Sequence, residues 1–189
     1  METGPIMPAS GGYRNLEAFK LATIVYDGTT SFCNRFVAPR SRTNDQMIQA
    51  ARSGKQNIVE GSMASATSSK SEIFLLNVAR ASLEELLNDY EDYLRQNGHR
   101  QWDKNEEKAA YIRKIARREE KGYKDYCKYV EEKSAETAAN TMICVINQAS
   151  FLLRRMIKRN ERNFVEQGGL TERMHAARSA ARRKQQPER

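Results

Sequence analysis

Basic residues gather near the C-terminal end of the chain, between positions 154 and 162. They are Arg154, Arg155, Lys158, Arg159 and Arg162. Spacings of three and four residues place the last four on one face of a helix. Cationic arrays of this kind neutralise the phosphates of a nucleic acid. Because the sequence contains no zinc finger, RNP motif or Gly-x-x-Gly clamp, it predicts phosphate binding without sequence-specific readout.

Positive charge continues beyond the pair Gly168-Gly169. The further candidates for nucleic-acid binding are Arg173, Arg178, Arg182, Arg183 and Lys184. Residues 1–98 contain 10 Lys and Arg against 11 Asp and Glu, whereas residues 99–189 contain 22 against 13. The second half therefore carries the whole positive excess. Such asymmetry indicates a polyanionic partner at one end of the molecule, the alternative being a charge bias that only improves solubility.

A second set of polar residues lies in the helix predicted over 43–62. Arg52, Asn57 and Glu60 could form a catalytic constellation, but such groups more often form a buried hydrogen-bonded network that fixes helix register. We interpret them as this structural network. The sequence has no nucleotide-binding glycine loop and no nucleophile elbow. We therefore predict a protein that is not an enzyme and has no catalytic residues.

Neither the carboxylates nor the cysteines predict a metal site. Acidic residues cluster in the helix predicted over 69–97, at Glu84, Glu85, Asp89, Glu91 and Asp92. This helix has no histidine to complete a carboxylate metal site, so the cluster is typical of a solvated face. Cys33, Cys127 and Cys144 are scattered without a Cys-x-x-Cys motif, as in reduced cytosolic proteins. We expect no metal, no cofactor and a cytoplasmic location.

Hydrophobic periodicity predicts an all-α protein built on an antiparallel up-down four-helix bundle. The long helices are predicted at 15–37, 43–62, 69–97 and 134–165. An extra charged helical insertion is expected at 103–133, and the sequence leaves open whether it joins the last long helix. A flexible leader (1–14) and a basic C-terminal segment (166–189) flank the bundle domain (15–165). No run of 18 apolar residues occurs, so we expect no membrane partner, and no secretory signal is visible at the N-terminus.

Two heptad seams predict the core. The first contains Leu76, Ala79, Leu83, Leu86, Tyr90 and Tyr93, and the second contains Ala138, Met142, Val145, Ala149, Leu152 and Met156. A further apolar stripe on the last long helix contains Ile143, Ile146, Leu153 and Ile157. This stripe fits either a wide core face or a subunit interface.

Two segments resemble a known family. Residues 46–61 resemble the signature helix Q-x-x-R-A-x-x-S-x-x-x-N-I-A-E-G of the four-helix-bundle family named for proteins encoded in intervening sequences of large-subunit ribosomal RNA genes. The residues that carry the resemblance are Gln46, Ala50, Ala51, Arg52, Ser53 and Asn57-Ile58-Val59-Glu60-Gly61. The sequence departs from the pattern in two places: Ala50-Ala51 precedes Arg52, and Val59 replaces the usual Ala. Residues 78–86 are similar to a second family element, A-x-x-S-x-x-E-L. Residues 168–174 are similar to the C-terminal extension G-G-F-x-E-R-M of some members, with Leu170 for Phe.

The resemblance implies a four-helix bundle that assembles into a homo-oligomeric ring, commonly a pentamer. A related protein accompanies the reverse transcriptase of diversity-generating retroelements. By analogy, the partners would be RNA rather than DNA, together with a reverse transcriptase or another RNA-processing protein. The sequence thus predicts a non-enzymatic, homo-oligomeric accessory protein that binds nucleic acid through its basic end. The alternative is a protein-interaction scaffold whose basic end docks an acidic partner.

Overall fold

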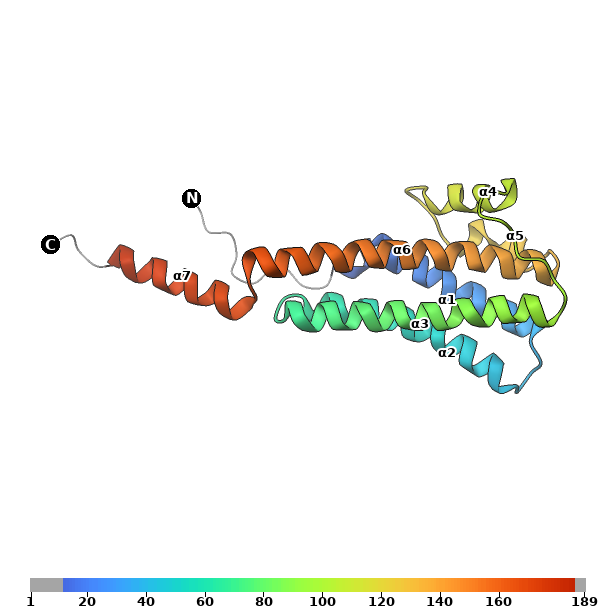
Figure 1. Ribbon diagram of the computed structural model, residues 1–189, viewed down its shortest axis with the longest axis horizontal. Coiled ribbons are helices and arrows are strands. Elements are labelled where there is room, and N and C mark those ends of the chain that lie inside the picture. The colour runs from blue at the N-terminus through green and yellow to red at the C-terminus, as the bar shows by residue number, and fades with distance from the viewer. Residues whose placement is uncertain (1–11, 186–189) are drawn as a thin grey trace.

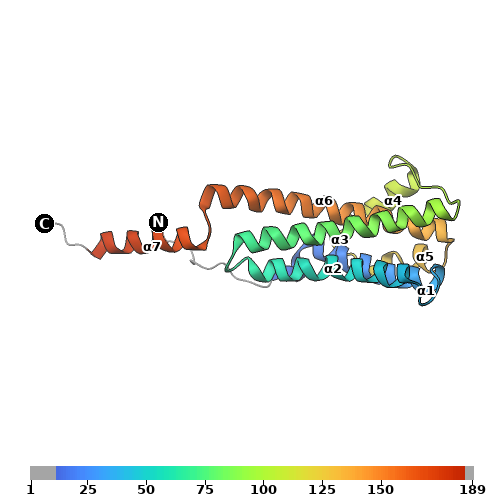
Figure 2. The same ribbon diagram turned by 60° about the horizontal axis from the view of Figure 1, so that its bottom comes forward.

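The computed structural model describes residues 12–185, so most of the predicted leader and the last four residues lie outside the described part. Within residues 12–185 all the regular secondary structure is helical and there is no strand, which confirms the predicted all-α class. The four longest helices are α1 (Glu17–Phe36), α2 (Arg42–Ala64), α3 (Ser69–Gln96) and α6 (Ala135–Gln167). Figures 1 and 2 show them side by side, with contacts between α1 and α2, α2 and α3, α3 and α6, and α6 and α1.

Serine side chains begin three of these helices. The Oγ atoms of Ser41, Ser68 and Ser134 accept hydrogen bonds from backbone N–H groups in the first turns of α2, α3 and α6, at 3.1, 3.1 and 3.3 Å. Each bond satisfies an N–H group that has no partner within its own helix. The described part of the chain begins with a short 3-10 helix, η1 (Gly12–Asn15), so the end of the predicted leader (residues 12–14) is helical.

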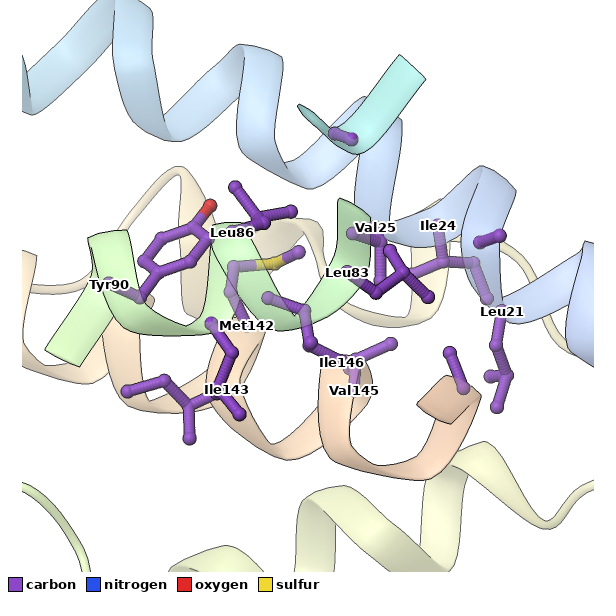
Figure 3. Packing of buried hydrophobic residues seen from close by; sticks show 14 of the residues in the cluster. Leu21, Ile24, Val25, Leu83, Leu86, Tyr90, Met142, Ile143, Val145 and Ile146 are labelled. Atoms are coloured by element: carbon purple, nitrogen blue, oxygen red, sulfur yellow. The ribbon is translucent and has the colours of Figure 1, made fainter. Parts of the chain in front are cut away.

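The two heptad seams supply the centre of the core. Leu83, Leu86 and Tyr90 of α3 are fully or almost fully buried and meet side chains of α6 and α1 (Figure 3). Leu152 and Met156, at the end of the second seam, are only half-buried. The further stripe is buried within the chain at all four positions, Ile143, Ile146, Leu153 and Ile157. It is therefore a wide core face and not a subunit interface, because α6 contacts α4 and α5 in addition to α1 and α3.

Glycines allow close approach at two helix contacts. A Cβ added to Gly54 of α2 would lie 2.7 Å from Leu83 Cδ2 of α3. A Cβ added to Gly28 of α1 would lie 2.5 Å from Met142 Sδ of α6. Both distances are shorter than carbon and sulfur atoms tolerate, so a Cβ at either position would force the end of the Leu83 or Met142 side chain to move.

The predicted insertion forms three short elements outside the four long helices, against α6 and α1. They are α4 (Glu107–Ala116), the 3-10 helix η2 (Tyr123–Asp125) and α5 (Cys127–Val130). Residues 131–134 separate α5 from α6, so the insertion does not join the last long helix. Buried Ala109, Ile112 and Ile115 give α4 its apolar side, and α4 packs against α6.

The last helix, α7 (Leu170–Gln185), begins after a sharp change in chain direction at Gly168, whose φ is 70°. Glycine adopts this left-handed conformation without steric cost. Figures 1 and 2 show α7 projecting beyond the ends of the other helices. Within residues 12–185, no helix is long and apolar enough to cross a membrane.

Candidate nucleic-acid interface

Four of the predicted basic residues converge on one open groove. The groove has a volume of about 560 Å³ and lies between the start of α1 and the second half of α6. Its apolar lining includes Leu16, Leu152 and Met156, and its basic lining consists of Arg155, Lys158, Arg159 and Arg162. Leu152 and Met156 are half-buried because they border this groove, whereas the buried positions of α6 at 149, 153 and 157 face the core.

The four groove cations are free to meet a ligand. All four side chains are exposed, and none forms an ion pair within residues 12–185. The Arg155 guanidinium lies 5.8 Å from the centroid of the exposed Phe151 ring, one turn away on α6. A planar cation beside an exposed aromatic ring is an arrangement that suits contact with phosphates and bases together.

The single acidic residue in the groove lining is already neutralised. Glu17 forms ion pairs with Lys20, at 2.7 Å, and with Lys121. Burial opposes ionisation of Glu17, but its hydrogen bonds to Lys121 and Lys20 and the charges of both lysines outweigh that effect and lower its pKa. The groove therefore keeps a net positive charge.

The other predicted basic residues lie elsewhere. Arg154 is exposed on α6 but does not line the groove. Arg178, Arg182 and Arg183 are exposed on the projecting α7, and the side chain of Lys184 lies outside the described part. Arg173 is half-buried at a small polar cavity of about 210 Å³ that also includes Glu72 and Asn160. The ten predicted basic residues thus do not form one continuous surface, and only four of them line the groove.

The buried network expected from Arg52, Asn57 and Glu60 is absent. The side chains of Arg52 and Glu60 are exposed and make no hydrogen bond or ion pair with other residues in 12–185. Asn57 is half-buried, and its Nδ2 donates to the Ser53 carbonyl oxygen at 2.9 Å and lies 3.2 Å from Ser53 Oγ. Ser53 Oγ in turn lies 3.0 Å from Ser82 Oγ of α3.

The polar contact between α2 and α3 therefore involves Ser53, Asn57 and Ser82. Sequence reasoning missed the two serines, although Ser53 precedes Asn57 by one helical turn and so shares its side of α2. Arg52 and Glu60 lie on the outer side of α2 because its core positions are Met47, Ala51 and Ile58. Helical spacing alone does not determine which polar side of a helix a neighbour will cover.

The acidic cluster on α3 is mainly solvated. Glu84 and Glu85 are exposed, Glu91 Oε1 accepts a hydrogen bond from Gln101 Nε2 at 2.9 Å, and Asp92 pairs with Arg95 at 2.7 Å. Within residues 12–185, no group of three or more His, Cys, Asp or Glu side chains could hold a metal ion. The Glu172-x-x-His175 pair on α7 accordingly has no third ligand in that range. The three cysteines are free thiols, and Cys33 is buried.

Comparison of the chain with protein-family models, with curated proteins and with solved structures found no match. The candidate interface therefore rests on the residues and geometry of this chain.

Proposed function

We propose that this chain is a non-enzymatic protein that binds single-stranded nucleic acid, with RNA preferred, through the groove between α1 and α6. The observation that supports it is the meeting of Arg155, Lys158, Arg159 and Arg162 above an apolar lining. Four unpaired cations suit a phosphate backbone. The apolar lining suits unstacked bases, which single strands offer and duplexes do not.

We also propose that α1, α2, α3 and α6 form an antiparallel up-down four-helix bundle related to the family that residues 46–61 and 78–86 resemble. Each consecutive pair among these helices is in contact, and the connections at 37–41 and 65–68 are too short to cross the length of a helix. An open groove beside the last helix of such a bundle is a surface on which a nucleic-acid strand can lie.

A homo-oligomeric ring would repeat this groove and increase its avidity. Exposed apolar side chains support self-association, since Phe74 is 65% exposed and Val165 is 83% exposed in the isolated chain. The exposed Arg52 and Glu60 are available for contacts between subunits. Light scattering coupled to size-exclusion chromatography tests this part of the proposal, and a monomer at micromolar concentration contradicts it.

The deciding experiment reverses the groove charge. We expect the change of Arg155, Lys158, Arg159 and Arg162 to Glu to abolish binding of a fluorescein-labelled RNA in an anisotropy titration, because the phosphates lose their partners. The matched control changes Arg42, Lys70, Lys104 and Lys114 to Glu. These residues are exposed and lie outside the groove, and the change in net charge is the same.

The control variant should retain most of the wild-type affinity. Equal losses in both variants would mean that net charge alone, and not the groove, attracts the RNA. If the wild-type protein binds neither RNA nor DNA at low salt but binds a polyglutamate peptide, the function is that of a scaffold for an acidic protein partner. Circular dichroism of both variants checks that they remain helical.

A further inference from the structure

A second hollow lies at the opposite end of α6 from the groove, and aromatic rings line it. Trp102, Tyr111 and Tyr129 contribute to an open pocket of about 520 Å³ between α4, α5 and the start of α6. The charged side chains in its lining are Glu107, Lys108 and Lys133, so cations outnumber anions. This volume falls within the range of small-molecule sites.

Hydrogen bonds hold the innermost ring in place. The backbone N–H of Trp102 donates to Asn140 Oδ1 at 2.7 Å, and Asn140 Nδ2 donates to the Arg100 carbonyl oxygen at 2.8 Å. Trp102 is only 9% exposed, and its indole N–H has no partner within residues 12–185. A buried indole N–H normally has a partner, so this donor is unsatisfied in the isolated chain.

Tyr111 is not needed for packing of α4. Its side chain is 45% exposed, whereas Ala109, Ile112 and Ile115 form the buried side of the same helix. The Tyr111 ring lies with its centroid 6.2 Å from that of Tyr129, at an interplanar angle of 62°. An exposed ring held at an angle to a second ring provides a face on which a planar ligand can stack.

Lysine ammonium groups accompany these rings. Lys108 Nζ lies 5.7 Å from the centroid of a Trp102 ring, and Lys128 Nζ lies 5.0 Å from that of Tyr129. Aromatic rings with adjacent cations fit a ligand that is planar and aromatic at one end and anionic at the other. A nucleotide has this chemistry, with its base on the rings and its phosphate beside the lysines.

The pocket and the groove lie on the same side of α6. Thr137 lines the pocket and Arg155 lines the groove, eighteen residues later in the sequence. Eighteen residues make about five helical turns and about 27 Å, so both residues point in the same direction from the helix axis. Between them, Thr141 is fully buried and Cys144 is partly buried where α4 and α5 pack against α6, so a strand that reaches both sites passes over these two elements.

We propose that this aromatic pocket binds one unstacked base of the RNA strand whose phosphates bind in the groove. The proposal rests on the proposed function for its macromolecular ligand, but the pocket can be tested separately with a mononucleotide. Trp102 is the single tryptophan of the chain, so its fluorescence reports occupancy of the pocket directly.

The first test titrates the protein with adenosine monophosphate and, as a matched ligand without a base, ribose 5-phosphate. We expect saturable quenching of Trp102 by the nucleotide and none by the sugar phosphate. Tyr111→Ala should lower the affinity for the nucleotide roughly 5- to 100-fold through loss of stacking. Tyr111→Phe keeps the ring and should bind the nucleotide as the wild type does. Phe164→Ala removes another exposed aromatic ring, from the far end of α6, and should have no effect on mononucleotide binding.

The second test separates this proposal from the groove. At about 3.4 Å per stacked nucleotide, an oligoadenylate of about 12 nucleotides spans both sites and one of 3 nucleotides does not. Tyr111→Ala should lower the affinity for both the long oligonucleotide and the mononucleotide. The groove charge reversal should lower only the affinity for the long oligonucleotide.

Absence of quenching by the mononucleotide, together with full affinity of Tyr111→Ala for the long oligonucleotide, overturns the pocket proposal and leaves groove binding intact. The groove proposal is overturned, and the pocket proposal supported, if the mononucleotide quenches Trp102 but the groove reversal leaves the affinity for the long oligonucleotide unchanged.

Discussion

The hydroxyl group of Tyr90 on α3 donates a hydrogen bond to Thr29 Oγ1 on α1, at 3.1 Å, where both side chains are fully buried. The principal neighbours of α1 are α2 and α6, as they are for α3. The bond therefore connects two helices across the core instead of two adjacent ones. Burial raises the pKa of Tyr90 well above its ordinary value, so the hydroxyl remains a donor over the whole physiological range.

Tyr90→Phe should lower the free energy of unfolding by about 1–3 kcal/mol, because Thr29 Oγ1 is left buried without its partner. Thr29→Val should have a similar cost. The double variant should lose less than the sum of the two, since it leaves no unpaired polar atom. Urea denaturation of the four proteins measures this coupling, and strict additivity would show that the bond contributes nothing.

Leu83→Ala and Leu153→Ala should each cost about 2–5 kcal/mol, because both side chains are fully buried and their removal leaves a cavity. Leu152→Ala should cost clearly less, since Leu152 is half-buried at the groove. The comparison of Leu152 with Leu153 is the sensitive one, because the two residues are adjacent in sequence. If Leu152→Ala lowered the free energy of unfolding more than Leu153→Ala, the side of α6 assigned to the core would be wrong.

Gly54→Ala should destabilise the protein by about 1–3 kcal/mol, although alanine favours a helix, because the new methyl group meets Leu83 Cδ2. Leu83→Val combined with Gly54→Ala should recover part of that loss. Gly122→Ala is the matched control, because its Cβ would meet nothing within 4 Å. Thermal unfolding of all variants provides the measurement, and a stabilised Gly54→Ala protein would contradict the close approach of α2 and α3.

Asp89→Asn should stabilise the protein at pH 7. Burial raises the pKa of Asp89, and the charges of Glu85 and Asp92 raise it further. A raised pKa in the folded state means that stability from this group is present below the unfolded pKa and is lost as pH rises through the folded pKa.

The asparagine side chain carries no charge, so the variant avoids that loss. The gain in free energy of unfolding should be less than about 1 kcal/mol, because water screens the charge of a partly exposed group. Its advantage should disappear below about pH 4, where the wild-type carboxyl is protonated in both states. Asp92→Asn should bring a smaller gain than Asp89→Asn, since it removes one charge that raises the Asp89 pKa but also breaks the ion pair with Arg95. Chemical denaturation at pH 3.5 and pH 7 decides between these outcomes.

The affinity for single-stranded RNA should fall steeply with salt. Four groove cations predict a slope of log affinity against log salt on the order of −3 per subunit, and the charge reversal should remove it. Deletion of residues 170–189 should weaken binding less than the reversal, because α7 projects away from the other helices (Figure 1). Anisotropy titrations at several salt concentrations give both quantities. If the charge reversal left the slope unchanged, the RNA phosphates would bind outside the groove.

The sequence by itself determined the helical class, most of the buried positions of α3 and the alignment of the basic row. Leucines and cations at spacings of three and four must share a side of whatever helix contains them. That local rule was sufficient to place Leu83 in the core and Arg155, Lys158, Arg159 and Arg162 in one exposed row. The rule depends only on the geometry of a single helix.

Tertiary structure decided which neighbour each side of a helix meets. The start of α1 near Leu16 turns the basic row into a groove, and the loop before α4 brings Trp102 beside Tyr111 and Tyr129. Packing also left Arg52 and Glu60 in solvent and buried the stripe that contains Ile143. Periodicity fixes a residue's angle around its own helix axis, but burial depends on contacts with segments that are distant in sequence.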